Sequence, residues 1–148
     1  MSLTIYSSEY FMQQAVLEAQ KAFAIGEVPV GAVIVCQNKI IARAHNQTEQ
    51  LCDVTAHAEI MAITTATQYL GSKYLAECSL YVTLEPCCMC AGALAWAQIG
   101  KIVYGAPDEK RGFMRYGRAL LHPKTKVEYS VMMDECSGVL KRFFLQKR

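Results

Sequence analysis

Two cysteines that stand three residues apart, Cys87 and Cys90, are the residues whose spacing first suggests chemistry. In a helix, side chains at positions i and i+3 lie on one face, so both sulfurs can reach one metal ion. Cys88 is rotated by ~100° from Cys87 at 3.6 residues per turn, and we expect it to pack as a thiol. Two ligands make an incomplete metal site, so the remaining ligands must come from elsewhere in the chain.

His57 and Glu59 stand two residues apart at the expected start of an earlier helix. One imidazole nitrogen and two thiolates are donors that Zn²⁺ prefers, and three protein ligands leave a fourth position for water. An open position is typical of a catalytic zinc, which makes water reactive near neutral pH. Glu59 beside it can take a proton from water and pass it to a leaving nitrogen, as hydrolytic deamination requires. The residues predict a catalytic zinc site with His57, Cys87 and Cys90 as ligands.

Other kinds of protein also contain a Cys-x-x-Cys pair, notably redox enzymes and structural zinc sites. Neither gives a reason for His57 and Glu59, and the chain has no second Cys-x-x-Cys to complete a four-cysteine site. A zinc-stabilised RNA-binding module without turnover stays open as a third interpretation, although it leaves Glu59 unexplained. A catalytic site is the interpretation that uses all four residues.

The elements that must position these residues follow from the hydrophobic pattern. It predicts helices from an N-cap at Ser8 to Gly26, and from a cap at Thr55 or Ala56 to residue 70. Further helices are predicted over 87–98, over 133–144 and, briefly, within 107–123. Strands are predicted over 31–36, 40–45, 79–83 and 102–105, with an edge strand over 126–131. This alternation favours one α/β domain, residues 1–148, with helices on both faces of a sheet.

Composition narrows the class of protein. The chain is 53% hydrophobic and 19% charged, which is too apolar for a disordered protein. Its apolar runs are shorter than the ~20 residues that a membrane span needs. Residues 1–6 lack the features of a secretory signal, so the seven cysteines are expected as free thiols and metal ligands in the cytoplasm.

Charge is distributed unevenly along the chain. Residues 1–109 contain five Lys/Arg and ten Asp/Glu, whereas residues 110–148 contain ten and three. A basic C-terminal quarter suits an anionic partner such as RNA. The other interpretation is a solvated helix end followed by a basic tail.

The motifs His57-Ala58-Glu59 and Pro86-Cys87-Cys88-Met89-Cys90 match the signature of zinc deaminases, in which His-x-Glu is followed by Pro-Cys-x-x-Cys. The chain resembles the cytidine deaminase-like superfamily, and within it the bacterial tRNA adenosine deaminases, almost from end to end. The segments that carry the resemblance are 27–32, 42–46, 55–61, 80–93, 134–136 and 143–144.

The resemblance implies a three-layer α/β/α fold with a central mixed five-stranded sheet, one Zn²⁺ per subunit and a homodimer. It implies deamination of adenosine to inosine at the wobble position, with a tRNA anticodon stem-loop as partner. Asn46 matches the position that hydrogen-bonds the flipped base, although an asparagine there can also form an Asx turn. The other expected substrate contacts are Val30, Ala58 and Pro86, and the expected RNA contacts are His45, Lys110, Arg111, Arg115 and Arg118.

The resemblance is weakest at residues 109–127, where the first part is bulkier and the second part is shorter. The same fold serves guanine, cytosine and nucleoside deaminases, and Ala95-Trp96-Ala97 is reminiscent of guanine deaminases. Deamination of a free base or nucleoside is therefore the alternative function. We expect Trp96 in the core or at a dimer interface, His45 at the RNA or packed on its neighbours, and Phe143 and Phe144 packed inward or against RNA.

Overall fold

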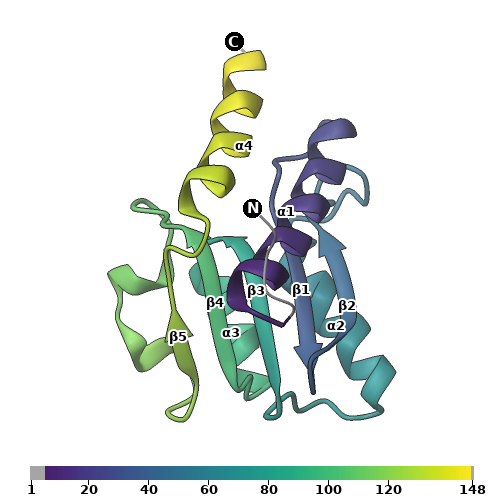
Figure 1. Ribbon diagram of the computed structural model, residues 1–148, viewed down its shortest axis with the longest axis vertical. Coiled ribbons are helices and arrows are strands. Elements are labelled where there is room, and N and C mark those ends of the chain that lie inside the picture. The colour runs from purple at the N-terminus through teal and green to yellow at the C-terminus, as the bar shows by residue number, and fades with distance from the viewer. Residues whose placement is uncertain (1–5, 148) are drawn as a thin grey trace.

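The computed structural model describes residues 6–147, which form five strands and four α-helices around one sheet (Figure 1). The strands are β1 (Gly31–Cys36), β2 (Lys39–His45), β3 (Cys78–Leu84), β4 (Lys101–Ala106) and β5 (Lys126–Glu128). The α-helices are α1 (Ser8–Ala24), α2 (Ala58–Leu70), α3 (Cys88–Trp96) and α4 (Met133–Gln146), and the 3₁₀ turns are η1 (Phe113–Arg115) and η2 (Arg118–Leu120). The predicted α/β architecture is confirmed.

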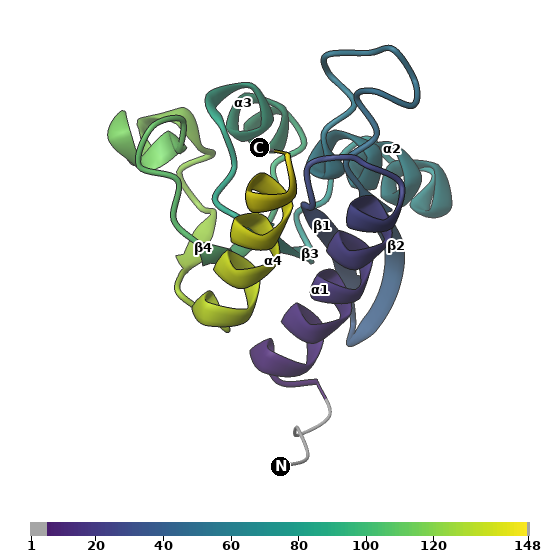
Figure 2. The same ribbon diagram turned by 90° about the horizontal axis from the view of Figure 1, so that it is seen from above.

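The sheet is mixed, with the strand order β2-β1-β3-β4-β5. β1 is antiparallel to both β2 and β3, whereas β3, β4 and β5 are parallel. Helices α1 and α4 lie side by side over one face, and α2 and α3 cover the other (Figure 2). The sheet is thus the middle layer of three, as predicted.

The strand directions bring four chain segments to one edge of the sheet. β3 and β4 are parallel and end together, and β1, which is antiparallel to β3, begins where β3 ends. β2 in turn ends where β1 begins, because Gly31 pairs with His45. We call this edge, at which β1 begins and β2, β3 and β4 end, the site edge. Val30 and Asn46 directly adjoin strands here, and the zinc residues lie at the starts of α2 and α3.

A tight turn makes the β1–β2 hairpin. Gln37 and Asn38 both have positive φ, 53° and 62°. Two central residues with positive φ form the type I′ turn, whose twist matches that of the strands. The predicted hairpin over residues 31–45 is therefore confirmed.

Gly31 allows helix α1 to lie directly against β1. A Cβ atom on Gly31 would lie 2.1 Å from the Ala15 carbonyl oxygen and 2.3 Å from the Ala19 nitrogen. No side chain fits at that distance, so glycine is required by close backbone approach. The helix and the strand that carries Val30 to the site edge are held together at this point.

Both predicted helix caps are wrong by one or two residues. Helix α1 is capped by Ser7, whose hydroxyl accepts from the Tyr10 N–H at 3.1 Å, while Ser8 donates its hydroxyl to Glu128. Helix α2 is capped by His57 because Thr55 is engaged earlier, donating its N–H and hydroxyl to Asp53. The second shift places the predicted zinc ligand itself at the helix start.

The ends of the chain also differ in detail from the predictions. β5 stops at Glu128 rather than residue 131, and Ser130 and Met132 have positive φ, which is incompatible with a continued strand. Helix α4 extends to Gln146. The prediction about residues 1–6 falls mainly on residues 1–5, which lie outside the described part of the chain.

Trp96 is 84% exposed, so the prediction that it could lie in the core is wrong. It is the last residue of α3, and its side chain faces away from the sheet side that Leu94 fills. Phe143 is buried against Phe23, with ring centroids 5.9 Å apart, whereas Phe144 is exposed. No helix within residues 6–147 is both long enough and apolar enough to cross a bilayer.

Candidate active site

Two helix N-termini meet at the site edge and bring three metal-binding side chains together. His57 is the N-cap of α2, Cys87 is the N-cap of α3, and Cys90 lies one turn into α3. Their ligand atoms all lie within 4.8 Å of one another. The His57 Nδ1 atom is 3.7 Å from the Cys87 Sγ atom and 3.5 Å from the Cys90 Sγ atom.

These distances fit zinc. Around a tetrahedral zinc with Zn–N of about 2.0 Å and Zn–S of about 2.3 Å, nitrogen and sulfur ligands lie roughly 3.6 Å apart. The observed nitrogen–sulfur separations bracket this value. The donor set of one imidazole and two sulfurs is also the one that zinc prefers, and three ligands leave a fourth position open.

A hydrogen bond from the Cys90 thiol stabilises the thiolate form of Cys87, which can bind a cation. The pKa of the Cys87 thiol is lowered to about 3, chiefly by a hydrogen bond from Cys90 and also by His57. The pKa of Cys90 is raised by the same hydrogen bond and by burial, and the pKa of His57 is raised by its hydrogen bond to Cys87. One thiolate is thus formed at neutral pH, and a divalent cation can replace the proton that Cys90 contributes.

Glu59 lies in the first turn of α2, two residues after the His57 ligand position, and is only 4% exposed. The pKa of its carboxyl group is raised to about 7, mainly because burial disfavours the charged form. A carboxyl group with a pKa near the working pH can both accept and donate a proton. Glu59 is therefore equipped for the acid–base role that its sequence position predicts.

A pocket of about 620 Å³ opens beside these residues. This volume lies within the range of small-molecule sites, roughly 300–1,000 Å³, and is large enough for a nucleobase with its ribose. The lining comes from all four segments of the site edge and from the starts of α2 and α3: Val28, Val30, Asn46, Thr48, Val54, His57, Ala58, Glu59, Leu84, Glu85, Cys87, Cys88, Met89, Asp108, Lys110, Arg111 and Tyr116. Among these lining residues of the described chain, none belongs to α4.

Three of the four predicted substrate contacts line this pocket, namely Asn46, Val30 and Ala58. Pro86 is not among the lining residues, and its carbonyl oxygen accepts the Phe113 N–H at 2.9 Å. Asn46 is 7% exposed and donates Nδ2 to the Val28 carbonyl oxygen at 3.3 Å. Its Oδ1 atom is buried without a hydrogen-bond partner in the described chain, so a ligand can satisfy it.

The predicted RNA contacts separate into two groups. Lys110 and Arg111 line the pocket. Arg115 donates to the Glu109 carbonyl oxygen at 2.9 Å and Arg118 donates to that of Thr125, so these two cations are engaged within their own segment.

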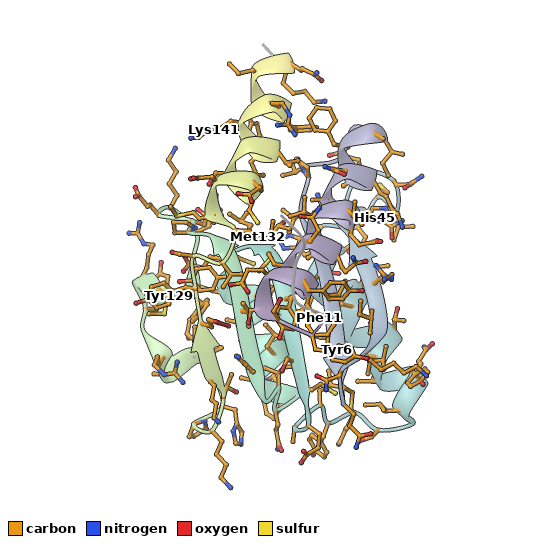
Figure 3. All side chains as sticks on the ribbon, viewed as in Figure 1. Tyr6, Phe11, His45, Tyr129, Met132 and Lys141 are labelled. Carbon is orange, nitrogen blue, oxygen red and sulfur yellow. The ribbon has the colours of Figure 1, made fainter. Side chains whose placement is uncertain are left out.

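His45 is not among the lining residues of the pocket, and it lies beside α1 at the end of β2 (Figure 3). Its Nδ1 atom is 3.6 Å from a carboxylate oxygen of Glu18, and the residue is partly buried. Of the two interpretations of His45, packing on its neighbours agrees with this position.

Cys88 is exposed and lines the pocket, so the prediction of a packed thiol is wrong. It follows the N-cap of α3, where a rotation of ~100° from Cys87 directs it outward rather than into the core. Several other lining residues are not predicted from the sequence, among them Thr48, Val54, Asp108 and Tyr116. These four belong to irregular loops without a residue pattern, so no local signal identifies them.

Residues 5–106 match the family described as the cytidine and deoxycytidylate deaminase zinc-binding region. The chain is 46% identical over 145 residues to a tRNA-specific adenosine deaminase of Aquifex aeolicus (strain VF5), covering 95% of each chain. It is 43% identical to a tRNA-specific adenosine deaminase of Bacillus subtilis (strain 168), covering 95% of this chain and 90% of that protein.

Two solved structures are also similar to this chain. One comes from a study of A-to-I editing by tRNA:A34 deaminases at the wobble position of transfer RNA. It is 41% identical with a TM-score of 0.84, covering 88% of this chain and 99% of that chain. A guanine deaminase from Bacillus subtilis is also 41% identical, with a TM-score of 0.66, covering 68% of this chain and 65% of that chain.

Proposed function

The chain belongs to the family of cytidine and deoxycytidylate deaminases that share this zinc-binding region, and we propose that it hydrolyses adenosine to inosine at the wobble position of a tRNA. The observation that carries the proposal is the pocket itself. Its lining joins Glu59 and two of the metal-binding side chains, His57 and Cys87, to Asn46 and to the cations Lys110 and Arg111. A buried base site bordered by cations suits one nucleotide of a longer anionic chain.

His57, Cys87 and Cys90 hold the zinc ion in this proposal. When bound, zinc supplies the Lewis acidity that makes water a nucleophile near neutral pH. Glu59 accepts a proton from the attacking water and delivers it to the leaving nitrogen. The bond from C6 of adenine to oxygen forms, the bond from C6 to the amino nitrogen breaks, and the products are inosine and ammonia.

Asn46 orients the base in this proposal. Its Oδ1 atom accepts a hydrogen bond from the substrate, while its Nδ2 remains tied to the Val28 carbonyl oxygen. Val30 and Ala58 contribute apolar contact to the walls of the pocket. We place Pro86 behind the base site, where its carbonyl oxygen holds Phe113.

Deamination of a free base is the second candidate, and the 41% identity to a guanine deaminase favours it. A small substrate is best enclosed when the site is sealed after binding. Here none of the described lining residues comes from the C-terminal helix α4, which packs on α1 and β4 instead. The position of α4 therefore supports the tRNA substrate.

A turnover experiment tests the proposal. Purified protein is incubated with an anticodon stem-loop that carries adenosine at the wobble position, and nucleosides are separated after digestion. Inosine should form, and Glu59→Ala should reduce its rate by about 10²–10⁴-fold. Ammonia release from guanine, cytosine, adenosine and cytidine is measured in parallel. Turnover of guanine without inosine formation in RNA would refute the tRNA assignment in favour of the second candidate.

The remaining expectations are part of the same proposal. We propose that residues 1–148 act as one zinc deaminase domain in the cytoplasm, where tRNA is available. We also propose a homodimer, in which the exposed Trp96 ring at the end of α3 is covered by the second subunit. Sedimentation of the purified protein would show a single monomeric species if this last proposal is wrong.

A further inference from the structure

Two buried carboxylates, Glu27 and Glu85, take no part in the proposed chemistry. They are 2% and 5% exposed, and no lysine or arginine within residues 6–147 forms an ion pair with either. Burial of an unpaired carboxylate is costly unless hydrogen bonds satisfy its oxygens. Each of these two residues accepts backbone N–H groups from a different loop at the site edge.

Glu85, which directly follows β3, holds both ends of one loop segment. Its Oε1 atom accepts the Asp108 N–H at 3.0 Å, and its Oε2 atom accepts the Met114 N–H at 2.9 Å. We call residues 108–114 the cationic rim loop, because its two cations, Lys110 and Arg111, line the pocket, although the loop also contains Asp108 and Glu109. One carboxylate therefore anchors the beginning and the end of the cationic rim loop.

The cationic rim loop is built closely around this carboxylate. A Cβ atom on Gly112 would lie 2.2 Å from the Glu85 Oε2 atom, so the backbone of the loop packs directly on it. The Asp108 side chain accepts the N–H groups of Lys110 and Arg111 at 3.2 and 3.0 Å. The backbone that carries the two cations is thus fixed in turn by a residue that Glu85 holds.

Glu27 makes the matching contacts with the loop that follows β2. Its carboxylate oxygens accept the N–H groups of Glu49 and Gln50 at 3.1 and 2.7 Å. The loop that it holds runs from Asn46 to His57 and contains neither lysine nor arginine. The two glutamates therefore perform the same backbone task, but only the loop held by Glu85 contains lysine and arginine side chains.

We propose that Glu85 is a positioning residue for RNA binding, which holds the cationic rim loop so that Lys110 and Arg111 meet phosphates of the substrate beside the pocket. This inference rests on the proposed function, because it assigns an RNA ligand to the rim. A loop ordered before binding does not have to lose conformational freedom when RNA binds. The two hydrogen bonds from the ends of the loop to the Glu85 side chain supply that order.

Glu85→Gln tests the role while keeping the size of the side chain. A glutamine amide has one acceptor oxygen and one NH₂ group, so it can accept only one of the two loop N–H groups and presents a donor to the other. One end of the cationic rim loop is released. We expect the affinity for an anticodon stem-loop to fall about tenfold at low salt, and the KM for the stem-loop to rise by a larger factor than kcat falls.

The decisive measurement is a double-mutant cycle on RNA affinity. Binding of a fluorescent anticodon stem-loop is measured by anisotropy between about 50 and about 200 mM salt, where phosphate contacts dominate the salt dependence. The proteins are wild type, Glu85→Gln, the double variant Lys110→Ala/Arg111→Ala, and the triple variant. Glu85→Gln should reduce both the affinity and the salt slope, and should have no further effect once the two cations are gone.

Glu27→Gln is the matched control, because it removes the same kind of contact from a loop without cations. It should leave the salt slope at the wild-type value and act independently of Lys110→Ala/Arg111→Ala. Equal losses of affinity from Glu85→Gln in the presence and absence of the two cations would overturn the proposal, as would an unchanged affinity. Inosine formation by the wild type is scored separately, so failure of the proposed function is distinguished from RNA binding without coupling to Glu85.

Discussion

At the scale of single residues, the Asn46 side chain makes one hydrogen bond within the described chain, although its amide could make four. Its amide nitrogen donates to the Val28 carbonyl oxygen, and its amide oxygen is buried and unpaired within residues 6–147. A buried polar atom without a partner is costly, so such an atom is usually kept for a ligand. The neighbouring Glu59 is similarly placed to act on a ligand rather than on the fold.

Asn46→Ala is expected to reduce kcat/KM for the stem-loop roughly 10- to 100-fold, because losing the partner of a buried polar group costs about 1–3 kcal/mol. The fold should tolerate the change, since the Val28 carbonyl oxygen still accepts the Val30 N–H at 2.9 Å. Steady-state kinetics and thermal unfolding check both parts. A fall in activity that merely follows a loss of folded protein would argue against a contact with the base.

The reactivity of Cys87 should report whether zinc is bound. With its pKa lowered to about 3, Cys87 is a thiolate at neutral pH and would alkylate readily unless a metal holds it. In zinc-loaded protein, the exposed Cys52 and Cys88 should be alkylated first. A chelator should add Cys87 to the labelled set, and restored zinc should protect it again. Peptide mass spectrometry would disprove ligation if Cys87 reacted equally fast under all three conditions.

At the scale of elements, close packing of α1 on β1 fixes the start of β1 at the site edge. Gly31 leaves no room for a side chain between the two backbones, and Val30 immediately precedes it in the pocket wall. The parallel pairing of β3 with β4 brings the ends of these two strands to the site edge. It brings Glu85 to within hydrogen-bonding distance of Asp108, although 23 residues separate them along the chain.

Gly31→Ala is expected to lower the free energy of unfolding by roughly 1–3 kcal/mol or more, since an added methyl group in a packed contact forces backbone shifts. Gly138→Ala, in helix α4, provides the control. A Cβ atom there meets only the end of the Arg142 side chain at 3.7 Å. This change should stabilise the protein by about 0.5–1 kcal/mol. Denaturant unfolding measures both, and similar effects of the two substitutions would contradict the close packing of Gly31.

At the scale of the whole molecule, the sheet lies between the zinc residues on one face and helices α1 and α4 on the other. Helices α1 and α4 pack together over one face, while the zinc residues project from the starts of α2 and α3 on the other. Each face of the sheet has its own hydrophobic core. Cys78 of β3 is buried in the core beneath α2 and α3, and Cys136 of α4 is buried in the core beneath α1 and α4. Neither residue lines the pocket, and both are covered by the packing of helices on the sheet.

These two buried thiols should react only when the protein opens. Burial raises the pKa of both Cys78 and Cys136 to about 12, so at pH 8 only about one thiol in ten thousand is ionised. Labelling of both residues should therefore follow global unfolding, and it should accelerate in step with denaturant. Mass spectrometry after pulses of alkylating reagent measures the rates. Rapid labelling of Cys136 in folded protein would show that α4 detaches by itself.

The sequence alone determined the features that depend on local spacing. Cys87 and Cys90 on one helix face, Glu59 two residues after His57, the β1–β2 hairpin and the α/β alternation all follow from periods of a few residues. The zinc ligand set follows from the same residue types and spacing, and the family resemblance adds the role of Asn46 as an expectation. Such features arise within short stretches of the chain and do not depend on contacts between distant segments.

Only the tertiary structure decided the surroundings of the site. The outward direction of Cys88, the diversion of His45 toward Glu18, and the lining of the pocket by Thr48 and Tyr116 depend on how helices and loops pack around the sheet. The contacts of Glu85 with Asp108 and Met114 bridge 23 and 29 residues. Long-range contacts of this kind depend on which strands become neighbours in the sheet, and local residue patterns do not specify that order.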